Sequence, residues 1–124
     1  MQTHRPELVA TVLGTKNPQK LAEFYQQLLG WTITSSSQEW VRLVPPEGGA
    51  GLSFQFEKKF KRPVWPRVKG EQQMTMHLDI GVDDLAEGVA FAESLGAKQA
   101  EFQPQDDVRV MVDPGGHLFC LFTD

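Results

Sequence analysis

The stretch NPQKLAEFYQQLLGW, residues 17–31, carries the clearest helix pattern in the sequence. Asn17 is a favourable N-cap, and Pro18 suits the first helical position because a backbone N–H there has no partner within the helix. Apolar residues then recur at helical spacing, at Leu21, Phe24, Tyr25, Leu28 and Leu29. Gly30 suits the left-handed position at which helices commonly end. The stretch therefore predicts a helix over residues 18–29.

The order of predicted elements in the first half of the chain recurs in the second half. One strand precedes this helix and three strands follow it, at residues 8–14, 31–34, 40–44 and 52–56. The second half predicts a strand, a helix and three more strands, at residues 74–82, 84–95, 97–102, 108–112 and 118–122. Leu-Ala-Glu lies near the start of both helices, from Leu21 and from Leu85, and Leu-Gly closes both. We therefore predict an α+β fold with two βαβββ modules.

Residues 58–73 separate the two modules and differ from them in composition. Pro63, Pro66 and Gly70 lie there among charged residues, which is typical of a connecting segment or a lid. Trp65 is the exception, because a solvated linker rarely carries a tryptophan. We predict a single domain over residues 1–124, divided into module one at 8–57, a linker at 58–73 and module two at 74–124.

Charge and composition narrow the classes of partner and compartment. The formal net charge is −4, and the basic residues are dispersed apart from the group at 58–62, so we predict no nucleic-acid partner. No apolar run approaches the roughly 20 residues that cross a bilayer, so we predict no membrane partner. The N-terminus lacks the apolar core of a secretory signal, and the one cysteine, Cys120, has no partner for an internal disulfide. Both observations predict a cytoplasmic protein.

Four stretches resemble the vicinal-oxygen-chelate superfamily, in particular its glyoxalase-like branch, which is related to bleomycin-resistance proteins and dioxygenases. They are residues 17–31, Gly51–Gln55, His77–Asp84 and Asp113–Cys120. The resemblance implies that the two modules curl their strands into an open, barrel-like mixed sheet with the helices outside. It also implies a ligand in the concave cleft, and a homodimer that completes the cleft. The superfamily holds lyases, dioxygenases, transferases and drug-sequestering proteins, so the activity stays open.

The resemblance also implies where a metal would bind. Catalytic members hold a divalent metal with inward-facing groups, commonly His and Glu, on the first and last strands of the modules. The matching positions here are Ala10, His77 and Cys120, with Ser53 or Gln55 on the fourth strand of module one. Ala10 has no donor atom, Cys120 changes the ligand type, and two donors are too few for a tetrahedral zinc site. We therefore predict no resident cofactor, with a divalent metal at His77 as the alternative.

Strand alternation predicts which side chains point into the cleft. Leu78 and Ile80 should pack under the second helix, so His77 and Asp79 lie on the opposite face of their strand. Two interpretations stay open for Asp79: a solvated carboxylate, or a general base beside His77. The predicted ligand-binding residues are His77, Gln55, Cys120, Ser53, Trp65, Phe122 and Leu118. No catalytic residue is assigned.

Three functions remain open at this point. The first is a small-molecule-binding protein with a degenerate metal site, which binds or sequesters an organic ligand in an aromatic cleft. The second is an enzyme, either a divalent-metal lyase or dioxygenase with unusual ligands or a metal-free isomerase that uses His77. The third is an interaction module whose cleft is plugged by its own side chains. The missing donor at Ala10 and the change at Cys120 favour the first, with a small organic molecule and a second copy of the chain as partners.

Overall fold

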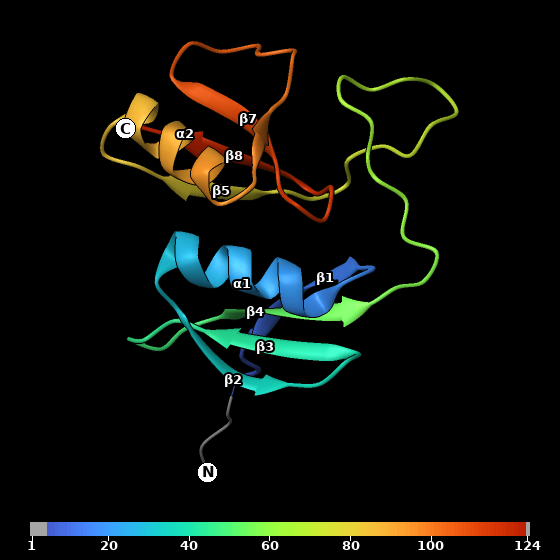
Figure 1. The fold of residues 1–124 in the computed structure, drawn as a ribbon, viewed down its shortest axis with the longest axis vertical. Helices are drawn as coiled ribbons and strands as arrows, with labels where there is room; N and C mark the ends of the chain where they lie inside the picture. The colour runs from blue at the N-terminus through green and yellow to red at the C-terminus, as the bar shows by residue number, and fades with distance from the viewer. Residues whose placement is uncertain (1–4, 124) are drawn as a thin grey trace. The chain divides into compact units, whose positions relative to one another are not determined.

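The computed structural model describes residues 5–123, so one of the three histidines, His4, lies outside the described residues. The chain forms two compact units that divide between Lys58 and Lys59. Each unit has the order strand, helix and three strands, which confirms the predicted pair of βαβββ modules and the α+β class (Figure 1). Within the described residues each unit has its own four-stranded mixed sheet, and neither sheet closes into a barrel.

The first unit has its five elements close to their predicted positions. They are β1 (Ala10–Thr15), α1 (Pro18–Leu29), β2 (Thr32–Ser36), β3 (Trp40–Val44) and β4 (Gly51–Phe56). The strand order is β1-β4-β3-β2, with β1 and β4 parallel and the other neighbours antiparallel. The Oδ1 atom of Asn17 accepts a hydrogen bond from the backbone N–H of Lys20 at 3.1 Å, and Gly30 ends the helix at a φ of 71°.

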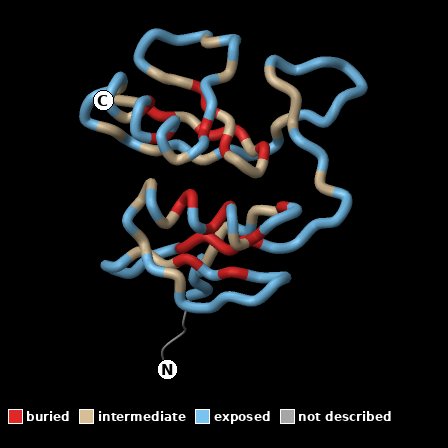
Figure 2. The backbone as a smooth tube through the Cα atoms, viewed as in Figure 1, coloured by how far each residue is buried: buried red, intermediate tan, exposed pale blue. Residues whose placement is uncertain are grey.

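Helix α1 covers one face of the first sheet. Tyr25 of the helix stacks on Phe54 of β4, with ring centroids 5.9 Å apart, and both side chains are fully buried. Phe24 meets Tyr25 edge to face at 4.9 Å. Figure 2 shows buried residues on α1 and on the strands that the helix covers. Because Phe54 faces the helix, its strand neighbours Ser53 and Gln55 lie on the helix-free face, as alternation predicts.

The second unit repeats this arrangement. Its elements are β5 (Leu78–Gly81), α2 (Leu85–Ser94), β6 (Lys98–Gln99), β7 (Val108–Val112) and β8 (Leu118–Phe122). The strand order is β5-β8-β7-β6, with β5 and β8 parallel and the other neighbours antiparallel. The carboxylate of Asp84 caps α2 by accepting a hydrogen bond from the N–H of Glu87 at 2.9 Å. Val82, two residues after Ile80, packs against Gly88 of α2, which extends the alternation predicted for Leu78 and Ile80.

Two strands of the second unit are shorter than predicted. Strand β5 begins at Leu78 rather than at residue 74, because its parallel register pairs Leu78 with Phe119 and β8 starts only one residue earlier. Strand β6 covers two residues rather than 97–102. The side chain of Gln103 donates to the carbonyl of Val110 at 2.9 Å and accepts from its N–H at 2.8 Å. The backbone N–H of Ala100 also donates to that carbonyl at 2.9 Å, but the N–H of Val110 bonds to a side chain where the backbone ladder would continue.

Residues 59–73, the connecting strap, contact elements of the second unit. Phe60 lies against His117 with ring centroids 4.7 Å apart, and the side chain of Arg62 lies directly over Gly116. The indole N–H of Trp65 donates to the carbonyl oxygen of Phe102 at 3.0 Å. These contacts show how the predicted linker is held on the turn before β8 and on the loop before β7. No helix in the described part of the chain has the length and apolar character needed to span a bilayer.

Candidate binding site on the second sheet

The helix-free face of the second sheet carries a polar pair. The Nε2 atom of His77 lies 3.0 Å from Oδ1 of Asp79. Asp79 lies within β5, and His77 is the residue directly before that strand. The two residues are two positions apart, so their side chains point to the same side of the chain. The exposed fractions are 35% for the His77 side chain and 63% for that of Asp79, so a ligand can reach both. The structure confirms the predicted orientation of both residues.

Cys120 joins this pair across the sheet. The parallel register of β5 and β8 places Asp79 beside Cys120, so both side chains point to the helix-free face. One donor atom from each of His77, Asp79 and Cys120 lies within 4.8 Å of the others. Burial raises the pKa of the Cys120 thiol, and the negative charge of Asp79 raises it further. The three side chains form one cluster, which we call the His-Asp-Cys cluster.

Apolar side chains surround this cluster on the same face. Leu118 and Phe122 lie two residues before and after Cys120 on β8, and Val110 of β7 pairs directly with Cys120. Leu118 and Val110 are buried, whereas Phe122 is half-buried. Gly81 pairs with Phe122, and the ring edge lies 3.8 Å from where a Cβ would stand. The missing side chain therefore leaves room beside the ring.

A cavity of about 280 Å³ opens at this end of the face. Its lining residues are Gly81, Val82, Asp83, Phe122 and Thr123. Phe122 and Gly81 belong both to this cavity and to the face that carries the cluster. We refer to the helix-free face at His77, Asp79, Gly81, Leu118, Cys120 and Phe122 as the site face.

The remaining predicted site residues belong to other elements of the chain. Ser53 and Gln55 belong to the first unit, where Ser53 is buried and Gln55 is exposed. On the helix-free face of that sheet, Trp40 pairs with Gln55 and Arg42 pairs with Ser53. Sequence reasoning did not place Arg42, because the register of β3 against β4 is needed to do so. The ring of Trp65 lies against that of Phe102, which belongs to the loop before β7, with ring centroids 5.9 Å apart.

The donor set of the cluster differs from the one that the resemblance implies. Ala10 pairs with Gly51 in β1 and offers no donor atom, so the pattern of catalytic members is not reproduced there. The second sheet adds a donor that the sequence reasoning left out, the carboxylate of Asp79. An imidazole nitrogen, a carboxylate oxygen and a thiol sulfur suit zinc, whereas magnesium and calcium prefer oxygen alone. The residues present therefore fit a thiophilic ion better than a hard one.

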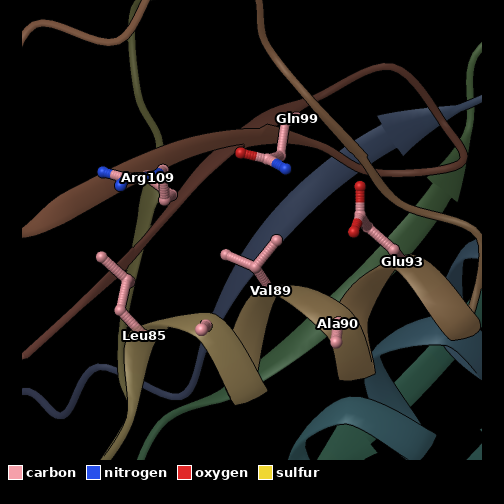
Figure 3. Close-up of a pocket in the computed structure, with 7 residues that line it drawn as sticks. Leu85, Val89, Ala90, Glu93, Gln99 and Arg109 are labelled. Atoms are coloured by element: carbon pink, nitrogen blue, oxygen red, sulfur yellow. The ribbon is translucent and has the colours of Figure 1, made fainter.

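A second hollow lies on the opposite, helical side of this unit. A cavity of about 470 Å³ separates α2 from β6 and β7 (Figure 3). The helix supplies an apolar wall, and the strands supply polar residues; the lining residues are Leu85, Ala86, Val89, Ala90, Glu93, Gln99 and Arg109. None of the predicted site residues lines it. We call this cavity the groove beside α2. Substitutions in it serve as controls for substitutions on the site face, because the two lie on opposite faces of the sheet.

Comparisons with known proteins agree with the fold. The model of the glyoxalase-like domain family matches residues 10–122. A glyoxalase/bleomycin resistance protein/dioxygenase family enzyme from Burkholderia phytofirmans PsJN is similar in structure, with a TM-score of 0.72 and 15% sequence identity over 95% of this chain and 98% of that one. A glyoxalase-related enzyme from Fulvimarina pelagi has a TM-score of 0.66 and 16% identity over 95% and 88% of the two chains.

A third similar structure is TnmS3, described as an antibiotic binding protein from Streptomyces sp. CB03234. Its TM-score is 0.57, at 16% identity over 98% of each chain. A search of curated protein sequences gave no significant match. At these identities the structural likeness shows the fold alone, whereas the family match spans both βαβββ modules. The chain therefore belongs to the glyoxalase-like domain family, within the vicinal-oxygen-chelate superfamily.

Proposed function

We propose that the protein binds a small organic molecule on the site face of the second module. The observation that carries this proposal is the pair formed by His77 and Asp79, 3.0 Å apart and partly exposed, beside the apolar side chains of Leu118 and Phe122. Small-molecule sites typically combine apolar walls with a few well-placed polar groups. That one structural neighbour is described as an antibiotic binding protein supports the same reading.

Each part of the site face has a separate role in this proposal. The half-buried ring of Phe122 covers apolar surface of the ligand, at about 25 cal/mol per Å² removed from water, and the buried Leu118 packs on the same face of β8. His77 and Asp79 orient a hydroxyl, carbonyl or amine group of the ligand by hydrogen bonds. Ligand binding needs no metal in this proposal, because Ala10 offers no donor atom at a position where catalytic members carry a metal ligand. A nucleophilic role for Cys120 is disfavoured, because burial and Asp79 raise the pKa of its thiol.

The test is a screen of small aromatic and carbonyl compounds by thermal shift, with a chelator present throughout. Hits are then titrated against the wild type and three single variants. We expect His77→Ala and Phe122→Ala to weaken binding about tenfold or more, which corresponds to about 1.4 kcal/mol. Gln99→Ala, in the groove beside α2, should leave it unchanged. The proposal fails if the groove variant alone loses binding. It also fails if compounds bind only when the chelator is left out, because that result would favour a metal-dependent function instead.

Two further parts of this proposal concern Trp65 and the first module. We expect bound ligand to change tryptophan fluorescence and Trp65→Ala to weaken binding without unfolding the protein, because the connecting strap is the longest connection in the chain. Gln55 and Ser53 stay predicted ligand contacts on the helix-free face of the first sheet, and Gln55→Ala tests them in the same titration. The homodimer and the cytoplasm also stay predictions, the latter resting on the free thiol of Cys120.

A further inference from the structure

We infer that the groove beside α2 is a second small-molecule site, which binds an aliphatic monocarboxylate through Arg109. The groove lies on the helix-covered side of the second sheet and shares no residue with the site face. The site is therefore separate from the proposed function and does not rest on it, and the resemblance assigns no ligand to this side of the sheet. Its volume of about 470 Å³ falls within the usual range of small-molecule pockets, about 300–1,000 Å³.

Arg109 is a charged residue on the face of the sheet that α2 covers. It pairs with Leu121 of β8, and Met111 lies two residues further along β7, so the three side chains share one face. Leu121 and Met111 are fully buried, whereas Arg109 is half-buried. A charge on a core face costs free energy unless it is paired, so an arginine at this position favours an anionic ligand.

The backbone holds the guanidinium of Arg109 in place. Its Nη1 atom donates to the carbonyl oxygens of Asp106 and Val108, both at 2.9 Å, and lies 3.3 Å from that of Gln105. These contacts all use Nη1, which leaves Nη2 and Nε for a ligand. Among residues 5–123, no carboxylate forms an ion pair with this guanidinium. A fixed guanidinium can bind both oxygens of one carboxylate, which an ammonium group cannot do.

The groove exists because α2 carries smaller side chains than α1. Leu-Ala-Glu lies near the start of both helices, at Leu21 and at Leu85, and counting from this triplet matches Tyr25 of α1 with Val89 of α2. The ring of Tyr25 stacks on Phe54 and fills the space over the first sheet. Val89 has no ring, so the same layer of the second module stays partly open as the groove.

The two modules also differ on the strand beneath the helix. Val41 and Arg109 are each the second residue of β3 and β7, and each pairs with the fourth residue of the next strand, Phe54 or Leu121. Val41 is buried. Strand β6 ends opposite Met111, two positions short of Arg109. The second module thus carries an arginine beside a hollow where the first module has a packed valine.

The charges along the groove define the class of ligand. Figure 3 shows Arg109 and Glu93 toward different ends of the groove, with Val89 between them. Leu85 and Ala90 add to the apolar wall that the helix supplies. A carboxylate at Arg109 therefore continues into an apolar chain along α2, and the far end of that chain approaches Glu93. A second carboxylate would be repelled there, whereas an ammonium group would be attracted.

Binding is measured on the full chain at neutral pH, by calorimetry and by NMR, with hexanoate as the probe. We expect saturable binding of one hexanoate per chain, with a Kd of about 1 mM or lower for a ligand of this size. Hexanamide has the same chain without the charge and should bind at least about tenfold more weakly. Because of Glu93, ω-aminohexanoate should bind more tightly than hexanoate, and the dicarboxylate adipate more weakly.

Variants then identify the residues of the groove. Arg109→Gln should weaken hexanoate binding at least about tenfold, and Val89→Phe should do the same by placing a ring in the hollow. Glu93→Gln should remove the difference between ω-aminohexanoate and adipate, which a merely structural role for Glu93 would leave in place. The matched control is Lys98→Gln, which removes a cation of the same sheet outside the groove lining. Both Lys98→Gln and Phe122→Ala should keep the hexanoate affinity of the wild type.

Several results would overturn this site. They are no saturable hexanoate binding up to about 10 mM, equal affinities for hexanoate and hexanamide, or unchanged affinity in folded Arg109→Gln or Val89→Phe. If neither variant folds, backbone amide shifts of the wild type decide, because bound hexanoate should move signals of α2 and β7, and shifts confined to other elements reject the site. Loss of hexanoate binding in Phe122→Ala alone would place the acid on the site face, which rejects the groove and leaves the proposed function standing.

Discussion

Cys120 shows how a neighbouring strand sets the chemistry of a single residue. Its position among Leu118, Phe119, Leu121 and Phe122 suggests a small buried hydrophobe, and its half-buried state fits that reading. Across the sheet, however, lies the carboxylate of Asp79. Burial first and this negative charge second raise the pKa of the thiol, so the metal-free protein keeps Cys120 protonated at neutral pH. A protonated thiol is a poor nucleophile.

The first prediction concerns the reactivity of this thiol in metal-free protein. The pH at which iodoacetamide modifies Cys120 rapidly should lie above that for free cysteine, and Asp79→Asn should lower it only in part because burial is the larger cause. A raised pKa in the folded state also means that its contribution to stability is present below the usual thiol pKa and is lost as the pH rises through the folded-state value. A rate profile identical to that of free cysteine would contradict this prediction.

Gly51 is a residue whose role follows from a close backbone approach. A Cβ at this position would overlap the carbonyl oxygen of Leu43, which cannot move aside as a flexible side chain would. We predict that Gly51→Ala lowers the free energy of unfolding by about 1–3 kcal/mol, the usual range for overpacking. Gly81→Ala is the matched control, since its Cβ would meet only an ordinary contact with Phe122. Urea denaturation of both variants measures the difference, and equal stabilities would refute the explanation.

Among the elements, the connecting strap differs most from its expected character. Its composition predicts a solvated linker or a lid, yet Phe60, Arg62 and Trp65 each contact a loop of the second unit. The contact at Arg62 depends on Gly116, which has a φ of 98° and no side chain beneath the arginine. A tight turn before β8 therefore serves as a docking point for the strap.

The next prediction tests this docking point with a pair of substitutions. Gly116→Ala should destabilise the protein by about 1–3 kcal/mol, because the left-handed backbone strains an alanine and its Cβ would stand 2.5 Å from Cγ of Arg62. In an Arg62→Ala background only the backbone strain remains, so Gly116→Ala should lower the free energy of unfolding by less. Thermal unfolding of the four proteins gives the coupling energy. Equal costs in both backgrounds would show that the strap does not press on this turn.

At the scale of the molecule, each four-stranded sheet ends in edge strands within the described residues, and the first unit exposes apolar side chains. Leu8, Val9 and Val12 are 74%, 53% and 46% exposed, and Val12 belongs to β1 at the edge of the first sheet. Exposed edge strands and clustered apolar residues commonly mark association surfaces. We therefore propose that a homodimer covers this edge.

Light scattering at tens of micromolar chain should give twice the mass of one chain. Val12→Asp should shift the protein toward the monomer, because a dimer interface would bury the added charge. Val68→Asp, at another exposed valine in the strap, should leave the dimer intact. A monomeric wild type, or equal effects of the two substitutions, would count against this interface.

Much of the fold could be predicted from local patterns, and part of the site could as well. Asn17, Pro18 and Gly30 mark the ends of α1 through contacts with residues three or four positions away, which the sequence displays directly. Alternation likewise placed His77 opposite the helix. The length of β6 could not be predicted, because the N–H of Val110 donates to the side chain of Gln103, seven residues away, rather than to a backbone carbonyl of β6.

The sequence by itself therefore determined the order of elements, the family and the faces of the strands, because each depends on neighbours within about one helical turn or on a period of two. The tertiary structure decided which strands lie side by side and in which register. That register brought Asp79 of β5 next to Cys120 of β8, forty-one positions along the chain, and so turned two donors into three. Register is set by packing of the whole sheet against its helix, and this information is not carried by any one segment.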